Sequence, residues 1–449
     1  MARVLPRSLI ILVLLVFSIV SAFSQEETPP ANPFTLGLGL GIGVQSFNEE
    51  GGQVTYQSLS LAPDFSIGPF GIGLALTLNY RFDDESQFVI RQADWVPTDF
   101  ASFLSLYLAK IAYIRWGVKG DPLFIKAGSF TDATLGNGFI MSNYDNTLFL
   151  PETRIFGLGV DIDGALFGFP FVGIETLIGN LAVLDVIGGR LYVRPLAATG
   201  LPILENLEIG GTLAVDTKPY LYSDTTDTAE PILVFGGDIR QPILTGPVFS
   251  LAAFADVASI RAESIGGAVG FGGRIIGIFT YGAQIRMLGP DFIPNYFNAT
   301  YDLFRADQYN AVVLGGGTET IFGWFASLGT SLLDDKIIFN VGLDGPFSAP
   351  YPGAVPGDSE YVLNYPHLRG VFTIAEGIVP GISVDFSYDK KGIATWEDLV
   401  NPTNAAIQAQ INYRTGPAVL SFIYMIRYAP GQTPDWITTS GLQTSIQLF

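Results

Sequence analysis

The sequence predicts an all-β fold, a transmembrane antiparallel up-and-down β-barrel of about 20 strands within a range of about 18 to 22. Three observations lead to this prediction. The chain of 449 residues is 48% hydrophobic and only 14% charged, whereas a soluble domain carries about 25% charged residues. Apolar residues alternate with small or polar ones, and the connections between the alternating segments are long and short in turn. Only one long apolar run occurs, which excludes a bundle of membrane-spanning helices of about 20 apolar residues each.

That apolar run lies at the N-terminus and is typical of a signal peptide over residues 1–24. Arg3 and Arg7 form a basic start, residues 9–20 form an apolar core, and Ala22 and Ser24 supply the small residues of a cleavage site. A membrane anchor is the alternative. Residues 25–33 form a polar leader with prolines, and we expect the barrel to occupy residues 34–449. The absence of cysteine excludes a lipoprotein.

The alternation has a period of two residues, which is the period of a β-strand. In the first segment one face is apolar and the other is nearly bare, because Phe34, Leu36, Leu38, Leu40, Ile42 and Val44 alternate with Gly37, Gly39, Gly41 and Gly43. Similar segments recur to the end of the chain. From the C-terminus backwards they lie near 439–449, 417–427, 405–414, 381–389, 367–376, 336–344, 322–332, 277–286, 265–275, 248–256, 231–240, 206–216, 189–195, 169–179, 155–163, 122–130, 108–119, 88–95, 71–82, 54–67 and 34–44.

These segments favour a membrane barrel over a soluble sandwich. Their polar faces hold Gly, Ser, Asn and Asp, and their length is about 9–11 residues, which suits a tilted crossing of a bilayer. Several apolar faces end in an aromatic residue suited to the membrane interface, such as Tyr80, Trp116, Tyr388 and Tyr413. A sheet in lipid must close, because lipid offers its edges no hydrogen-bond partner. The segments number 21, and since bacterial barrels usually have an even number, at least one before residue 120 is in excess.

Connection lengths sort by parity in the C-terminal half. Residues 287–321, 345–366, 390–404 and 428–438 are long connections, and residues 333–335, 377–380 and 415–416 are turns. Outer-membrane barrels have short turns at one end and longer loops at the other.

At this point the chain resembles the porin-like β-barrels of the bacterial outer membrane. The resemblance rests on the signal peptide, the alternation throughout 34–449, and the terminal Phe449. It implies that Phe449 is the assembly signal read by the barrel-assembly machinery. It also implies a location in the outer membrane of a diderm bacterium, contact with outer-membrane lipid, small polar solutes as partners, and an oligomer as an option.

Charged residues on the polar parity of the strands are candidates for the lumen, because an arginine facing lipid at mid-bilayer costs about 2–4 kcal/mol. They either line a pore and select solutes by charge, or pair with one another across strands; both interpretations stay open. These candidates are Arg81, Arg115, Arg190, Arg194, Arg414, Asp161, Asp163 and Asp385.

Residues 131–154 interrupt the alternation with a segment rich in Asn, Tyr and Phe. Long ordered loops usually have a function, so we hypothesise that this segment folds into the barrel and narrows it. The constriction candidates are Asn137, Asn143, Tyr144, Asp145, Asn146 and Glu152. The alternative is an outside loop that packs on its neighbours. Residues 287–321, with Thr300 as an N-cap, could cover the outer mouth.

The predicted function is an outer-membrane channel for passive diffusion of small hydrophilic solutes. Nucleic acid is excluded as a partner, because 23 Lys and Arg face 42 Asp and Glu. With His367 as the single histidine and no cysteine, the sequence offers neither a metal cluster nor a catalytic triad, so we expect no enzyme, metal or cofactor. The alternatives are a transporter of hydrophobic compounds, with an apolar pocket and a plugged lumen, and a surface adhesin or structural barrel.

Overall fold

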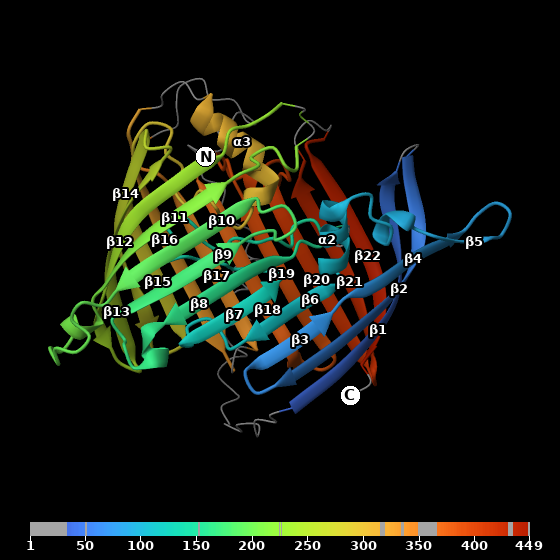
Figure 1. Ribbon diagram of the computed structural model, residues 1–449, viewed down its shortest axis with the longest axis horizontal. Coiled ribbons are helices and arrows are strands. Elements are labelled where there is room, and N and C mark those ends of the chain that lie inside the picture. The colour runs from blue at the N-terminus through green and yellow to red at the C-terminus, as the bar shows by residue number, and fades with distance from the viewer. Residues whose placement is uncertain are drawn as a thin grey trace, which may run out of the picture.

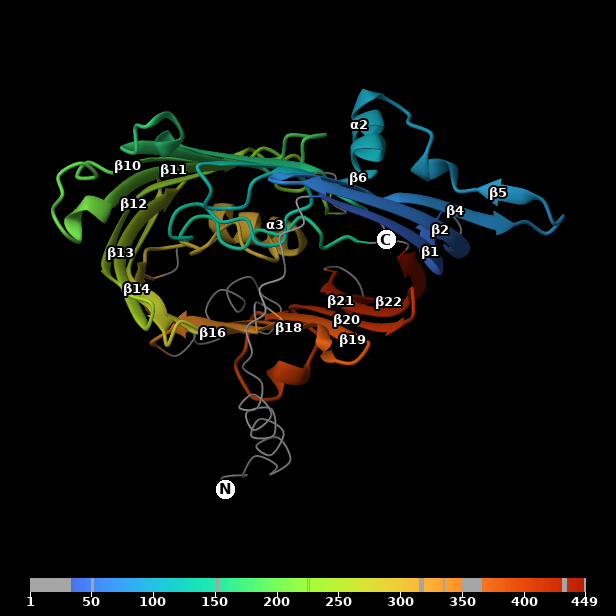
Figure 2. The same ribbon diagram turned by 90° about the horizontal axis from the view of Figure 1, so that it is seen from below.

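The computed structural model describes residues 34–49, 52–150, 153–223, 225, 227–314, 319–333, 336–348, 366–429 and 434–447. The predicted signal peptide, the leader, Glu152 and Phe449 lie outside these residues. The strands form one antiparallel sheet that closes on itself (Figures 1 and 2), which confirms the predicted barrel. Among the described residues, no helix has both the length and the apolar character needed to cross a membrane.

The elements of the first half of the chain are β1 Phe34–Glu49, β2 Gly52–Ile67, β3 Phe70–Leu74, β4 Leu76–Phe82, β5 Phe88–Ile90, η2 Gln92–Asp94, α2 Phe100–Leu108, β6 Ile111–Trp116, β7 Leu123–Gly128, β8 Gly157–Asp163, η3 Gly164–Phe167, β9 Val172–Ile178, β10 Val186–Val193, η4 Leu204–Asn206 and β11 Glu208–Asp216. Those of the second half are β12 Ile232–Thr245, β13 Phe249–Ile260, β14 Ser264–Ile275, β15 Phe279–Leu288, α3 Tyr301–Val313, β16 Ile321–Leu332, β17 Ile337–Pro346, β18 His367–Val379, β19 Ile382–Lys390, η5 Asp398–Val400, β20 Ala405–Thr415, β21 Ala418–Tyr428 and β22 Trp436–Gln447.

The wall of the barrel has 20 strands, in agreement with the prediction. β3 and β4 both pair with β2, so they are two halves of one strand that is interrupted at Ala75. β3 then pairs with β6, from which the sheet runs in chain order to β22, and β22 pairs with β1. Each strand lies beside its neighbour in sequence, which is the predicted up-and-down order.

The surplus segment is 88–95, which the alternation had predicted as a strand. Only Phe88–Ile90 pairs, with the end of β4, and the chain then turns into η2. The helix α2 follows, where the alternation predicts only a connection between strands. Asp99 caps α2 by accepting a hydrogen bond of 2.7 Å from the Ser102 amide, and Ser102 Oγ accepts a bond of 2.8 Å from the Asp99 amide. This Asp-x-x-Ser capping pattern is the signal that could have predicted the helix.

The two faces of the wall differ as the alternation predicts. On β14, Ile265, Val269 and Phe271 point outward and are 54%, 59% and 49% exposed. The alternating Gly270 lies against the neighbouring strand, where a Cβ atom would come within 2.7 Å of the Phe254 ring. The apolar half of each strand therefore forms the outer surface, and small residues form much of the inner one.

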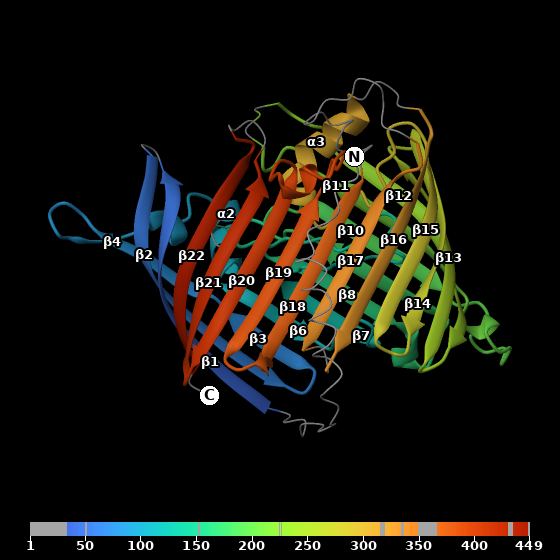
Figure 3. The ribbon, with the colours of Figure 1, turned by 180° about the vertical axis from the view of Figure 1, so that it is seen from behind.

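The barrel closes through a short ladder. β1 and β22 pair over five positions, from Gly39 opposite Gln447 to Gly43 opposite Gln443. Beyond Gly43, β1 continues to Glu49 and, among the described residues, pairs there only with β2. β1 and β22 diverge above this point (Figures 1 and 3). The panel formed by β1, β2 and β4 is thus joined to β22 only at its lower end.

This partial seam can be tested with disulfides, because the chain has no cysteine. Paired residues of an antiparallel ladder have Cα atoms about 4.5–5.5 Å apart, within the range of a disulfide. The double variant Ile42→Cys/Thr444→Cys should therefore form an intramolecular disulfide in folded protein. The matched pair Val44→Cys/Leu442→Cys lies two residues further along, just past the last paired position, Gly43 opposite Gln443. We expect it to form far less disulfide under the same oxidation, as measured by gel mobility. Equal disulfide yields in the two variants would show that β1 and β22 also pair beyond Gly43.

Candidate functional site

Two connections enter the barrel and fill one side of it. Residues 129–156 join β7 to β8, and residues 289–320, which include α3, join β15 to β16. Figure 2 shows α3 inside the ring of strands. Met141, Tyr144, Tyr296 and Phe297 are fully buried, in a core that they share with inward residues of the wall. The described residues of 131–154 therefore fold inward, as hypothesised, and the alternative of an outside loop is wrong.

Backbone and side-chain bonds hold the first segment in place. Ala133 and Tyr144 exchange backbone hydrogen bonds of 3.1 and 2.9 Å, which closes a tight loop between them. Asn146 accepts a bond of 2.7 Å from the Phe130 amide and donates one of 2.9 Å to the Gly179 carbonyl. Asn137 donates a bond of 3.2 Å to Asp256 on the wall. These residues are anchors of the segment.

The second segment is anchored by a buried arginine. Arg305 of α3 donates to Asp216 at the end of β11, over 2.6 Å from Nε, and to Asp185 over 2.9 Å from Nη1. Arg305 is 1% exposed and both aspartates are fully buried. Tyr144 of the first segment donates a bond of 3.2 Å to Asp302. Burial raises the pKa of Asp302 well above its usual range. The two segments and the wall thus share one buried polar network.

The space that the two segments leave is a cavity of about 1380 Å³. Its lining joins the first segment to the inner faces of β17–β20 across the barrel. Charges of both signs and several amides face it. They include Asp132, Asp145, Asp385, Arg154, Arg369, Asn143, Asn340, Gln408 and Gln410.

Three of the predicted residues, Asn143, Asp145 and Asp385, line this cavity. The structure places Tyr144 and Asn146 elsewhere: both are fully buried, because their polar atoms bind Asp302 and the backbone of the wall. Burial raises the pKa of Asp145 to about 6. Asp145 accepts bonds of 2.6 Å from the amide and the hydroxyl of Thr147, which fix its orientation.

Arg190 and Arg194 belong to a paired network, which lies beneath the first segment. Arg190 donates to Asp238 over 2.9 Å and to Glu208 over 2.9 Å. Arg194 donates to Glu208 over 3.1 Å and to Asp163 over 2.6 Å. Arg190 is 2% exposed, and a Cβ at Gly136 of the first segment would lie 2.7 Å from its Nε. For these residues cross-strand pairing is the interpretation that the structure supports.

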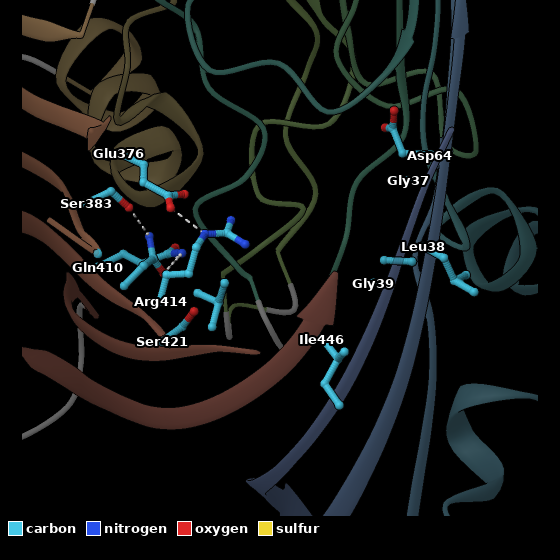
Figure 4. Close-up of a pocket in the computed structure, with 14 residues that line it drawn as sticks. Gly37, Leu38, Gly39, Asp64, Glu376, Ser383, Gln410, Arg414, Ser421 and Ile446 are labelled. Atoms are coloured by element: carbon cyan, nitrogen blue, oxygen red, sulfur yellow. Dashed lines mark hydrogen bonds and ion pairs between the residues drawn. The ribbon is translucent and has the colours of Figure 1, made fainter. Parts of the chain in front are cut away.

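The remaining predicted charges lie apart from the large cavity. Asp161 pairs with Lys119 over 2.7 Å. Arg81 is exposed on β4, and Arg115 lies on β6 opposite Lys126. Arg414 pairs with Glu376 over 2.5 Å at a smaller cavity of about 410 Å³ beside the seam (Figure 4).

His367 is bound on both sides, with Nε2 2.9 Å from Asp389 and Nδ1 3.5 Å from Asp344. Asp344 also pairs with Arg286 over 2.6 Å. This row of charges joins β15, β17, β18 and β19, in keeping with a structural role for the histidine. Within the part of the chain that the structure describes, no group of three or more potential metal-ligating side chains comes together.

Sequence reasoning did not single out Arg305, Asp185 or Asp216, because they are far apart in the chain. The spacing of Asp302 and Arg305 was the one local signal, since residues three apart are neighbours on a helix. The amides of the cavity, such as Gln408 and Gln410, were visible as polar positions on β20. Amides on the polar parity of a strand are therefore a signal for lumenal residues, as charges are.

No protein-family model matches the chain, and no curated protein matches it. Among solved structures it is similar to OccK2 (OpdF) of Pseudomonas aeruginosa in complex with glucuronate, at 11% identity and a TM-score of 0.32, over 93% of this chain and 97% of the other. It is also similar to a BenF-like porin from Pseudomonas fluorescens Pf-5, at 9% identity and a TM-score of 0.35, over 93% and 99%. A third is OccAB4 of Acinetobacter baumannii, at 10% identity and a TM-score of 0.31, over 92% and 96%. The barrel architecture rests on the strand pairing given above.

We predict a large loss of stability when the positive charge of Arg305 is removed. Arg305→Met leaves Asp185 and Asp216 buried without a counter-charge, and breaking such a pair costs about 3–5 kcal/mol. Denaturant unfolding in detergent should show this loss, and Arg305→Met/Asp216→Asn should recover part of it. The control Lys119→Ala removes a half-exposed partner of Asp161, a contact worth about 0–1 kcal/mol. Similar losses in both variants would contradict the anchoring role.

Proposed function

We propose that the protein is an outer-membrane channel for small hydrophilic solutes. The observation that carries the proposal is the cavity of about 1380 Å³ inside the barrel, lined by carboxylates, guanidinium groups and amides. Polar groups of this kind replace part of the hydration shell of a passing solute. The apolar outer face of the wall supports a location in the membrane, and the resemblance to porin-like barrels supports the outer membrane of a diderm bacterium.

In this proposal the constriction is built by the first inward segment. Asn143 and Asp145 present their side chains to the cavity from that segment, and Arg369 and Asp385 face it from β18 and β19. Opposed charges across a narrow lumen produce a transverse field, which orders polar solutes and excludes apolar ones. Arg154 donates a bond of 3.3 Å to Ser129 Oγ and adds a cation on the same side as Asp145. The barrel needs no cofactor for passive diffusion.

Purified protein in a planar bilayer should therefore give single-channel current steps. Asp385→Asn and Asp145→Asn should each lower the permeability ratio of K⁺ to Cl⁻, because each removes a lumenal negative charge. Arg369→Gln should raise the ratio. The matched control Asp161→Asn removes a carboxylate that is paired with Lys119 away from the cavity, and we expect it to leave the ratio unchanged. A folded barrel without current steps would favour an adhesin or a structural role.

The same ratio should depend on pH through Asp145. Its pKa is raised to about 6 by burial, so the carboxyl is charged at about pH 7 and neutral at about pH 5. The K⁺ preference should fall across this interval in reversal-potential measurements, and Asp145→Asn should remove the step. Because the folded state binds this proton more tightly than the unfolded chain does, its protonation adds stability as the pH falls. Thermal unfolding at both pH values should show a folded barrel, which separates titration of Asp145 from loss of the fold.

A further inference from the structure

A second, smaller cavity adjoins the large one at the end of the barrel that has the short turns. Its volume is about 410 Å³, which lies within the range of about 300–1,000 Å³ typical of small-molecule sites. Gln410 of β20 and Ala62 of β2 line both cavities, so the two spaces meet at these residues. Gly381, in the turn between β18 and β19, also lines the smaller cavity. A solute that leaves the large cavity past Gln410 therefore enters the smaller one.

Polar side chains of three neighbouring strands form a row along this cavity. Ser383 of β19 lies opposite Asn412 of β20, which in turn lies opposite Ser421 of β21. All three residues line the cavity. Asn412 donates a bond of 3.0 Å to Ser383 Oγ, and Gln410 donates one of 2.9 Å to Asn412 Oδ1 (Figure 4). A chain of hydrogen bonds thus fixes the orientation of the row.

The wall opposite this row carries small residues. Gly37 and Gly39 of β1 and Ala62 of β2 line the same cavity. A Cβ atom at Gly37 would lie 3.6 Å from the Asp64 Cβ, which is an ordinary van der Waals distance. Figure 4 shows Arg414 and Asp64 on opposite sides of the space between the two walls. The small residues leave this space open to a ligand.

The charged groups at the smaller cavity already have partners within the protein. Arg414 pairs with Glu376 over 2.5 Å on one side, and Asp64 accepts a bond of 2.6 Å from the Tyr113 hydroxyl on the other. A charged ligand would have to compete with these partners. A neutral ligand can bind without separating Arg414 from Glu376.

The uncharged groups of the row offer both donors and acceptors to a ligand. Within the described part of the chain, Gln410 keeps one N–H and its carbonyl oxygen after the bonds given above, and Asn412 keeps one N–H. The serine hydroxyls can donate as well as accept. A carboxylate ligand uses only donors and an ammonium ligand only acceptors, whereas each hydroxyl group of a polyol uses both. The row therefore matches a ligand with several hydroxyl groups.

We propose that the smaller cavity is a binding site for a small neutral polyol. The hydroxyl groups of the polyol replace water on Asn412, Gln410 and the two serines, while Arg414 and Glu376 stay paired. The proposal rests on the channel function proposed above and names a solute class for it. The rival ligands are an anion bound by Arg414 and a cation bound by Asp64.

The absence of cysteine allows the site to be tested by protection of a single thiol. Ser421→Cys places the thiol in the row, where a small methanethiosulfonate reagent modifies it in purified, detergent-solubilised protein. Sorbitol should slow this modification in a saturable manner. Gluconate and N-methylglucamine carry a negative and a positive charge on a similar skeleton, and each should slow it less.

The matched control Ser387→Cys lies on β19 and faces the large cavity, and sorbitol should leave its rate of modification unchanged. Stronger protection of Ser421→Cys by either ion would overturn the neutral site in favour of a rival ligand. Equal protection at both positions, no protection, or a thiol at position 421 that the reagent does not reach would also overturn it.

Two further changes, each added to Ser421→Cys, alter the site from opposite walls. Asn412→Leu removes the amide at similar size and should raise the half-protecting concentration of sorbitol about tenfold, the effect of one to two hydrogen bonds. Asn412→Gln retains an amide and should stay closer to the parent value. Gly37→Phe fills the cavity from β1 and should abolish protection. The control Gly189→Phe lies on β10 opposite Leu213, which is 53% exposed on the outer surface, and it should retain protection.

Heat-dependent gel mobility reports whether each variant is folded. Protection of folded protein that survives both Asn412→Leu and Gly37→Phe unchanged would overturn the site. Protection requires no ion flow, and single-channel current steps are measured in parallel. The absence of current steps would contradict the channel function, whereas current steps without protection would contradict the polyol site alone.

Discussion

The buried pairing of Arg305 with Asp185 and Asp216 is the interaction on which the interior of this barrel depends. A wall of 20 strands with small inward residues encloses more space than its own side chains can fill. Two connections occupy that space, and Arg305 binds the longer one to the wall at two points, over 2.6 and 2.9 Å. The first segment then packs on the second and bonds to Asp302 through Tyr144. The cavity is the space that remains between the first segment and the opposite wall.

The glycines of the wall gain a specific role from this arrangement. A Cβ at Gly266 would lie 2.4 Å from the Phe292 ring, and a Cβ at Gly179 would lie 2.5 Å from the Tyr144 hydroxyl. At Gly188 it would meet Leu135 at 2.9 Å. The inward segments therefore seat their large side chains in recesses that only glycine leaves open. The wall and the two inward segments are complementary in shape, and close packing of this kind holds the segments in place.

The sequence predicted the wall well, because alternation is a local property that each strand carries by itself. It predicted the inward course of 131–154 from composition, since Phe139, Met141 and Tyr144 are too apolar for a solvated tip. It could not separate anchors from lining residues within that segment: Tyr144 and Asp145 are neighbours in sequence, yet one is fully buried and the other faces the cavity. That distinction depends on contacts with Asp302 and Thr147, and so on the path of the backbone. The error at 88–95 has a similar origin, because a short apolar alternation also fits a hairpin outside the wall.

The N-terminal panel of β1, β2 and β4 is the part of the wall with the least complete strand pairing between the polar lumen and the outer surface. Its two edges are paired at their lower ends, to β22 as far as Gly43 and to β6 as far as Leu74. Unpaired backbone groups are unfavourable in hydrocarbon. The backbone groups of each free edge therefore need hydrogen-bond partners other than a neighbouring strand. At the β4 edge, the chain continues into η2 and α2, whose backbone groups form hydrogen bonds within each helix. The helix α2 presents aromatic side chains outward. A helix satisfies its backbone without a neighbour, which lets this part of the wall be interrupted where a strand could not be. The interruption at Ala75 is therefore compatible with a membrane.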